Sequence, residues 1–170
     1  MEEENYNNID EIENPQHQSL KERRGTFLTV LCILSWATSG FTFFNSLSTL
    51  FKGKKALQNE ILIIEEKLEM TDNGFFYDFF QGLIDQFYII FENFYGIYIS
   101  SFLISAVGIF SIYLMFNLNK KGFYLYLVYA FLSPLVAYYF FKDSTSLITG
   151  LIISIVFVIM YKANLKRMTN

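Results

Sequence analysis

Four long stretches of the chain contain no Asp, Glu, Lys or Arg, and they constrain the fold more than any other feature. They cover residues 25–51, 93–119, 122–141 and 144–161. The hydrocarbon core of a bilayer is about 30 Å thick, and about 20 residues of α-helix cross it. A backbone in lipid must satisfy its own hydrogen bonds, so each stretch is expected to be helical. The sequence predicts an all-α membrane protein, a bundle of four transmembrane helices spanning about 26–50, 94–117, 122–141 and 144–161.

The connections between the last three spans are short. Residues 119–122 and 142–144 are the only links between them. Connections of this length make consecutive helices antiparallel. Asp143 or Ser144 is placed to cap the N-terminus of the last span.

The chain begins with an acidic segment. Residues 1–24 are rich in Glu and Asn and poor in apolar side chains. Such a segment cannot bury a core, which predicts a disordered tail over 1–24 and a transmembrane domain over 25–170. The alternative is an acidic arm that binds a partner.

A long connection, residues 52–92, links the first two spans. Leu57, Ile61, Ile64 and Leu68 are spaced four, three and four residues apart, which places them on one face of a helix. Residues 71–74 then read as a turn. The pattern predicts an amphipathic helical segment outside the membrane or at its surface.

The second half of this connection is rich in aromatic residues and carries an acidic stripe. Asp78, Asp85 and Glu92 are seven residues apart, about two helical turns, so they share one side of a helix. This helix is expected either to lie on the membrane surface or to continue into the second span as one rod, with Gly82 and Gly96 as bend points. A cation site or proton path along the stripe is the functional alternative to a solvated side.

Small residues recur on three of the spans, and Ser35 and Ser39 form such a pair on the first. Such faces let helices approach closely in lipid, either within one chain or between two copies. Pro134 is expected to kink the third span because it removes a backbone donor. Tyrosines near the span ends suggest an aromatic belt at the membrane surfaces. The packing residues are Ser101, Ser105, Gly108, Ser146, Gly150 and Ser154, and the belt residues are Tyr124, Tyr126, Tyr138, Tyr139 and Tyr161.

No catalytic constellation is visible in the sequence. The one histidine, His17, is in the acidic tail, and the one cysteine, Cys32, lies inside a span. Neither a phosphate-binding glycine loop nor a metalloprotease or serine-hydrolase motif occurs. The net charge of −3, without a basic cluster, gives no sign of nucleic-acid binding. We therefore expect a protein that is not an enzyme and has no cofactor or metal.

The lysines and arginines indicate an orientation. Eight lie on the side of the two termini and five on the other side, and an excess marks the cytoplasmic side. This predicts that both termini are cytoplasmic. The eight are Lys21, Arg23, Arg24, Lys120, Lys121, Lys162, Lys166 and Arg167, and the five are Lys52, Lys54, Lys55, Lys67 and Lys142.

Two segments resemble a known group of proteins. Thr26-Phe-Leu-Thr-Val-Leu-Cys-Ile-Leu-Ser35 and Lys121-Gly-Phe-Tyr-Leu-Tyr126 are similar to motifs of small, uncharacterised four-helix membrane proteins of Gram-negative bacteria. There the first motif opens helix one and the second opens helix three. The resemblance implies a location in the inner membrane and brings no activity or functional residue with it.

These features are compatible with three kinds of function. A non-enzymatic interaction, scaffold or regulatory protein, with lipid, other membrane proteins or a second copy as partner, fits the small-residue faces and the amphipathic connection. A small transporter or channel with an acidic external mouth at Asp78, Asp85 and Glu92 is the alternative, although the spans contain no ionisable acid or base. An enzyme acting on lipid has the least support because no nucleophile, base or metal set is visible.

Overall fold

The structure is a computed structural model that describes residues 20–70 and 74–168. These residues form six α-helices and a short 3₁₀ turn, with no strand among them, and the all-α prediction is confirmed. The helices are α1 (Leu20–Lys52), α2 (Lys54–Glu69), α3 (Gly74–Glu92), α4 (Phe94–Phe116), α5 (Lys120–Phe141) and α6 (Ser144–Ala163), and the turn is Leu165–Arg167.

Four helices in this part of the chain are long and apolar enough to cross a membrane. They are α1 from Gly25 onward, α4, α5 and α6, with mean hydropathies of 1.5 to 2.1. In the most apolar segment of α6, only 6% of the residues are buried inside the protein. Apolar surface of that extent is unfavourable in water and favourable in lipid, which indicates an integral membrane protein.

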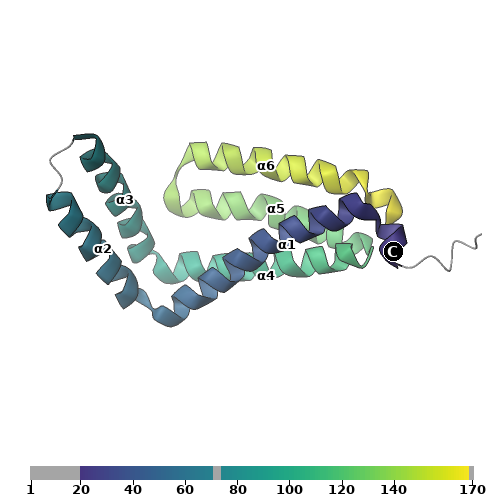
Figure 1. Cartoon of the computed structure of the whole chain (residues 1–170), viewed down its shortest axis with the longest axis horizontal. Coiled ribbons are helices and arrows are strands. Elements are labelled where there is room, and N and C mark those ends of the chain that lie inside the picture. The colour runs from purple at the N-terminus through teal and green to yellow at the C-terminus, as the bar shows by residue number, and fades with distance from the viewer. Residues whose placement is uncertain (1–19, 71–73, 169–170) are drawn as a thin grey trace, which may run out of the picture.

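These four span helices pack as neighbours in the order α1, α4, α5, α6. The main contacts join α1 to α4, α4 to α5, and α5 to α6. Figure 1 shows α4, α5 and α6 running side by side, with α1 laid along α4. The chain reverses direction at each short connection, as the sequence predicts.

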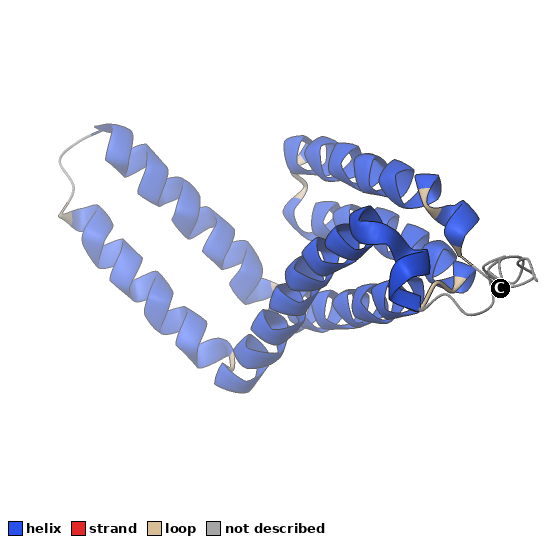
Figure 2. Ribbon diagram, turned by 45° about the vertical axis from the view of Figure 1, so that its right-hand side comes forward, coloured by secondary structure: helices blue, strands red, loops and turns tan. Residues whose placement is uncertain are grey.

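The other two helices form an antiparallel pair, which we call the hairpin. α2 packs on α3, and both begin or end where α1 and α4 meet. Figures 1 and 2 show the hairpin extending away from that corner. It slants away from the line of α4, so α3 and α4 do not form one straight rod. The break lies at Asn93 (φ −102°, ψ 23°), whereas Gly82 and Gly96 lie within helices.

Two helices begin before the spans predicted for them. α1 begins at Leu20, within the predicted tail, and Gly25 interrupts it with φ 72°. Residues 1–19 of that tail and the turn residues 71–73 lie outside the described residues. α5 begins at Lys120 rather than at residue 122, because the Asn119 side chain accepts a hydrogen bond from the Lys121 N–H and caps the helix.

The sharp turn between α4 and α5 contains a left-handed leucine. Leu118 has φ 60°, a conformation that usually favours glycine. The N–H groups of Leu118 and Asn119 bond to the carbonyls of Met115 and Leu114, which closes the end of α4. The Leu118 side chain is fully buried, so burial offsets the strain of its backbone.

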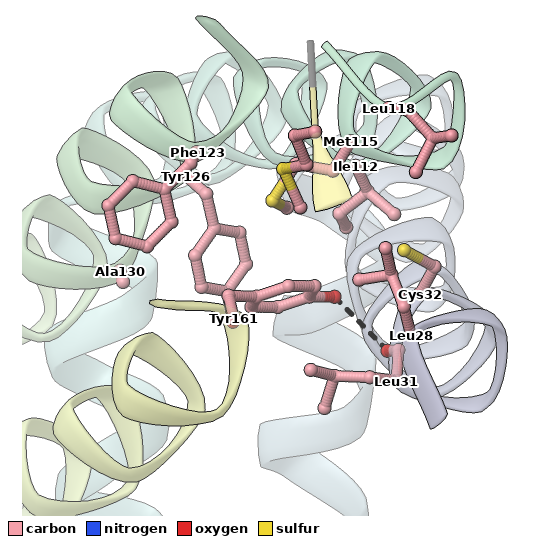
Figure 3. Close-up of a cluster of buried hydrophobic side chains, with 11 residues drawn as sticks. Leu28, Leu31, Cys32, Ile112, Met115, Leu118, Phe123, Tyr126, Ala130 and Tyr161 are labelled. Atoms are coloured by element: carbon pink, nitrogen blue, oxygen red, sulfur yellow. Dashed lines mark hydrogen bonds between the residues drawn. The ribbon is translucent and has the colours of Figure 1, made fainter. Parts of the chain in front are cut away.

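The main core lies at the end of the span helices nearest the C-terminus. All four span helices contribute to it, as Figure 3 shows. Tyr126 and Tyr161, expected in an aromatic belt, are buried in this core, whereas Tyr124, Tyr138 and Tyr139 are exposed. The core residues drawn there include Leu28, Leu31, Cys32, Ile112, Met115, Leu118, Phe123, Ala130 and Tyr161.

Candidate functional site

The hairpin is held together by apolar and polar contacts. Leu57 and Ile61 of α2 are buried in a cluster with Phe94 at the start of α4. Farther out, the Tyr88 hydroxyl of α3 donates a 2.8 Å hydrogen bond to the Glu65 carboxylate of α2. This bond to an anion raises the pKa of Tyr88 above its usual value of 10.0. These contacts join α2 to α3 and to the start of α4.

One side of α3 leaves large aromatic side chains uncovered. Phe75, Phe76 and Phe79 are 76%, 51% and 55% exposed, and Tyr77 is also exposed. α2 covers the opposite side, where Ile84 is buried. These aromatic residues lie at the far end of the hairpin from the span helices. We call Phe75, Phe76 and Phe79 the aromatic face.

The acidic stripe runs along the neighbouring side of α3. Asp78, Asp85 and Glu92 are all exposed, and the Gln81 amide donates a 3.3 Å hydrogen bond to Asp85. Their seven-residue spacing puts about 10 Å of helix between successive carboxylates. None of the three lines the cavity between α1 and α4 or the cavity between α1, α4 and α5. The three exposed carboxylates therefore follow a line along α3.

The small residues of α4 make room for a tyrosine of α5. A methyl group on Gly108 would lie 2.8 Å from the Tyr129 ring. That ring reaches α1, where the Ser39 hydroxyl donates a 3.0 Å hydrogen bond to the Tyr129 oxygen. Ser105 is buried and bonds to the carbonyl of Ser101 in its own helix. Gly108 thus permits a contact among three helices.

The small residues of α6 have three different surroundings. Gly150 lies against Pro134 of α5, since a methyl group on it would lie 3.0 Å from the proline Cβ. Ser154, one turn farther along, donates a 2.7 Å hydrogen bond to the Ala130 carbonyl. Ser146 does not share this contact, because its side chain is exposed and its hydroxyl donates to Asp143. Pro134 itself is buried, and α5 continues through it as one helix; the predicted kink stays a prediction.

A buried tyrosine joins the first and the last of the span helices. The Tyr161 hydroxyl of α6 donates to the carbonyl of Leu31, at 3.1 Å, and to the Ser35 hydroxyl, at 2.9 Å. Its ring lies 4.6 Å from that of Tyr126. The sequence signal for this contact is the Ser35–Ser39 pair, one turn apart on α1, but its partner is 126 residues away.

A cavity with hydroxyl groups lies between α1, α4 and α5. Its volume is about 140 Å³, and its wall includes Thr42, Ser101, Ser105, Tyr129 and Ser133. Within residues 20–70 and 74–168, no group of three or more His, Cys, Asp or Glu side chains is placed to hold a metal ion. The cavity therefore offers neutral hydroxyls rather than charged ligands.

Comparisons with protein-family models, curated protein sequences and solved structures found no match to this chain. The resemblance to small four-helix bacterial membrane proteins stays an expectation based on two motifs. The structure places residues 26–35 at the start of the α1 span and residues 121–126 in the first turns of α5.

Proposed function

We propose that this chain is a non-enzymatic interaction protein of a bacterial inner membrane, with the hairpin as its docking arm. The four span helices hold the arm at the bilayer. The aromatic face and the acidic stripe of α3 bind a protein partner. The observation that carries this proposal is the exposure of Phe75, Phe76 and Phe79 on a helix outside the candidate spans.

Exposed aromatic side chains of this size are costly in water. Contiguous apolar patches on soluble surfaces are rare and mark interaction sites. Aromatic side chains are also enriched at the centre of protein interfaces, where they fill pockets of the partner. An arm that carries three phenylalanines at its far end is suited to insert them into another protein.

The charge of the arm defines the kind of partner. α2 and α3 contain three lysines and seven carboxylates, which gives a net charge of −4. The acidic stripe lies beside the aromatic face on the same helix. The partner is therefore a protein surface with basic side chains around an apolar pocket, and charge complementarity would speed the encounter.

The proposed membrane topology of the chain follows from the distribution of its lysines and arginines. If both termini are cytoplasmic, the hairpin and the Lys142–Ser144 connection lie on the opposite side of the membrane. There the amphipathic α2, with Leu57 and Ile61 facing inward, supports α3. A partner would then meet the arm on the periplasmic side.

The transporter alternative has less support. It would need Asp78, Asp85 and Glu92 to face a path between the span helices, and all three are exposed on the hairpin. The spans carry hydroxyls but no charged group at mid-depth, where transport sites usually have them. Cation or proton flux through liposomes that falls when the three are changed to Asn or Gln would favour the transporter instead.

The test is site-specific photo-crosslinking of the full chain in native membranes. A photoreactive residue is placed at Phe76 or Phe79, and, as a matched control, at Ile152, which is similarly exposed on α6. We expect one discrete protein adduct from the hairpin positions and lipid adducts from the control. The double substitution Asp78→Asn/Asp85→Asn should lower the yield of the protein adduct, and the decrease should be larger at low salt. Lipid adducts alone from the hairpin would refute the docking arm, and adducts to a second copy would make the partner this same chain.

A further inference from the structure

An apolar slot lies between α1 and α4, away from the hairpin. Its volume is about 350 Å³, and it is lined by four α1 residues between positions 29 and 36, by Ile112, Tyr113 and Phe116 of α4, and by Asn117 just after α4. The seven-residue length on α1 corresponds to about 10 Å along the span. The slot is therefore elongated along the direction in which a lipid chain runs.

The slot opens toward the membrane rather than into the protein. Three of its wall residues, Ile33, Trp36 and Tyr113, are more than half exposed. Its inner side is formed by Cys32 and Ile112, which belong to the main core and which Figure 3 shows on α1 and α4. A hydrocarbon chain could enter from the bilayer without any helix moving.

Two polar side chains, Thr29 and Asn117, lie at one end of the slot. The Thr29 hydroxyl donates to the Gly25 carbonyl, and the Asn117 amide nitrogen donates to the Tyr113 carbonyl. Thr29 is near the start of the α1 span, and Asn117 follows the last residue of α4. This end is therefore at the membrane surface, and the Trp36 end lies deeper.

Positive charge gathers at the surface end. Lys120 and Lys121 begin α5 three and four residues after Asn117, and Lys121 is exposed. The N-terminus of a long helix adds a partial positive charge at the same place. The headgroup of an acyl chain in the slot would lie at the membrane surface where α5 begins with these two lysines, and such positive charge favours an anionic headgroup over a zwitterionic one.

We propose that the slot binds one acyl chain of an anionic phospholipid, with its phosphate held by Lys120 and Lys121. The site is separate from the hairpin and does not depend on the docking arm. Its lipid comes from the leaflet that faces the termini. It would fix the orientation of α1 against α4 near the main core.

The test uses the full chain in nanodiscs that contain a photoactivatable phosphatidylglycerol or the matching phosphatidylcholine. We expect adducts at slot residues with the anionic probe. Thr29→Trp and Ile33→Trp, which place a large ring in the slot, should abolish them. Ile148→Trp, at an exposed position of α6 outside the slot, should not.

The headgroup is tested by Lys120→Gln/Lys121→Gln, which leaves the slot intact. Each lysine is expected to raise the affinity for the anionic lipid about fivefold, so the double variant should bind it roughly 25-fold more weakly. Equal labelling by both probes, labelling unchanged in the double variant, or adducts that persist with Ile33→Trp would each overturn the proposal. If a tryptophan variant fails to fold, the double lysine variant still tests the proposal, because it leaves the slot residues unchanged.

Discussion

The Ser154 hydroxyl of α6 donates a 2.7 Å hydrogen bond to the main-chain carbonyl oxygen of Ala130 in α5. Ala130 lies four residues before Pro134, so its carbonyl lacks the N–H that an uninterrupted helix would supply. In lipid no water replaces this donor. Ser154 thus supplies the hydrogen bond that Pro134 removes from α5. Gly150, one turn earlier on α6, leaves space for the proline ring.

This relationship predicts coupling between Ser154 and Pro134. Ser154→Ala should lower the free energy of unfolding by about 0.6 kcal/mol, the average for hydrogen bonds between helices in a membrane. In a Pro134→Ala background the residue-134 N–H can bond to Ala130, so Ser154→Ala should cost much less. Unfolding in mixed detergent micelles, carried out as a double-mutant cycle, measures the difference. Equal costs in the two backgrounds would show that Ser154 does not serve the proline.

Gly122 is predicted to be the least replaceable glycine of those described. A methyl group there would lie 2.6 Å from both the Met115 nitrogen and the Ser111 oxygen, which are backbone atoms and cannot move alone. Gly122→Ala should cost about 3 kcal/mol, at the upper end of overpacking effects. Gly40→Ala is the matched control, because nothing lies within 4 Å of the added methyl group. The control should be neutral or slightly stabilising, and equal unfolding free energies for both variants would contradict the close approach of α4 and α5.

The span helices could be predicted from the sequence because their signal is local. Runs without charge need no knowledge of their neighbours, and four helices of the required length and hydropathy are present. The cap of α6 was predictable for the same reason, since Asp143 bonds to the N–H groups of Thr145 and Ser146 two and three residues away.

The contacts between helices could not be predicted in this way. The chain alone does not show that Tyr161 meets Ser35, because a tyrosine near a span end is equally suited to the membrane surface. Helical spacing predicts that Asp78, Asp85 and Glu92 share one side of α3. The spacing does not show which of the remaining sides is exposed, because that depends on how α2 packs on α3. The aromatic face is thus a property of the hairpin and not of α3 alone.

The buried Tyr161 gives a third prediction. Tyr161→Phe keeps the ring in the core and removes the bonds to Leu31 and Ser35. The loss should be about 1 kcal/mol of unfolding free energy, as for a typical buried hydrogen bond. Tyr139→Phe, at a largely exposed position, should change it by less than about 0.5 kcal/mol. If the two substitutions had the same effect in detergent unfolding, the Tyr161 hydroxyl would not tie α6 to α1.

The N-terminal cap of α6 should make that helix end sensitive to acid. Hydrogen bonds from the Ser146 hydroxyl and the Thr145 N–H lower the pKa of Asp143 below its usual value of 3.8. Because the folded pKa is depressed, the cap's contribution is complete above pH 3.8 and is lost as the pH falls through the lower, folded value. The Asp143 carboxyl should titrate below 3.8 by NMR. The amides of Thr145 and Ser146, corrected for intrinsic exchange, should lose protection from hydrogen exchange only at lower pH.

Two variants separate the charge of Asp143 from its capping bonds. Asp143→Asn keeps an acceptor for the helix and has no charge to lose, so protection at the start of α6 should no longer depend on acid. Asp143→Ala removes the acceptor, so the first turn should exchange faster at every pH. If the Asn variant kept the acid dependence, the titrating group would lie elsewhere. If the amides of Thr145 and Ser146 were as protected from exchange in Asp143→Ala as in the unsubstituted chain, the Asp143 cap would not be needed for the first turn of α6.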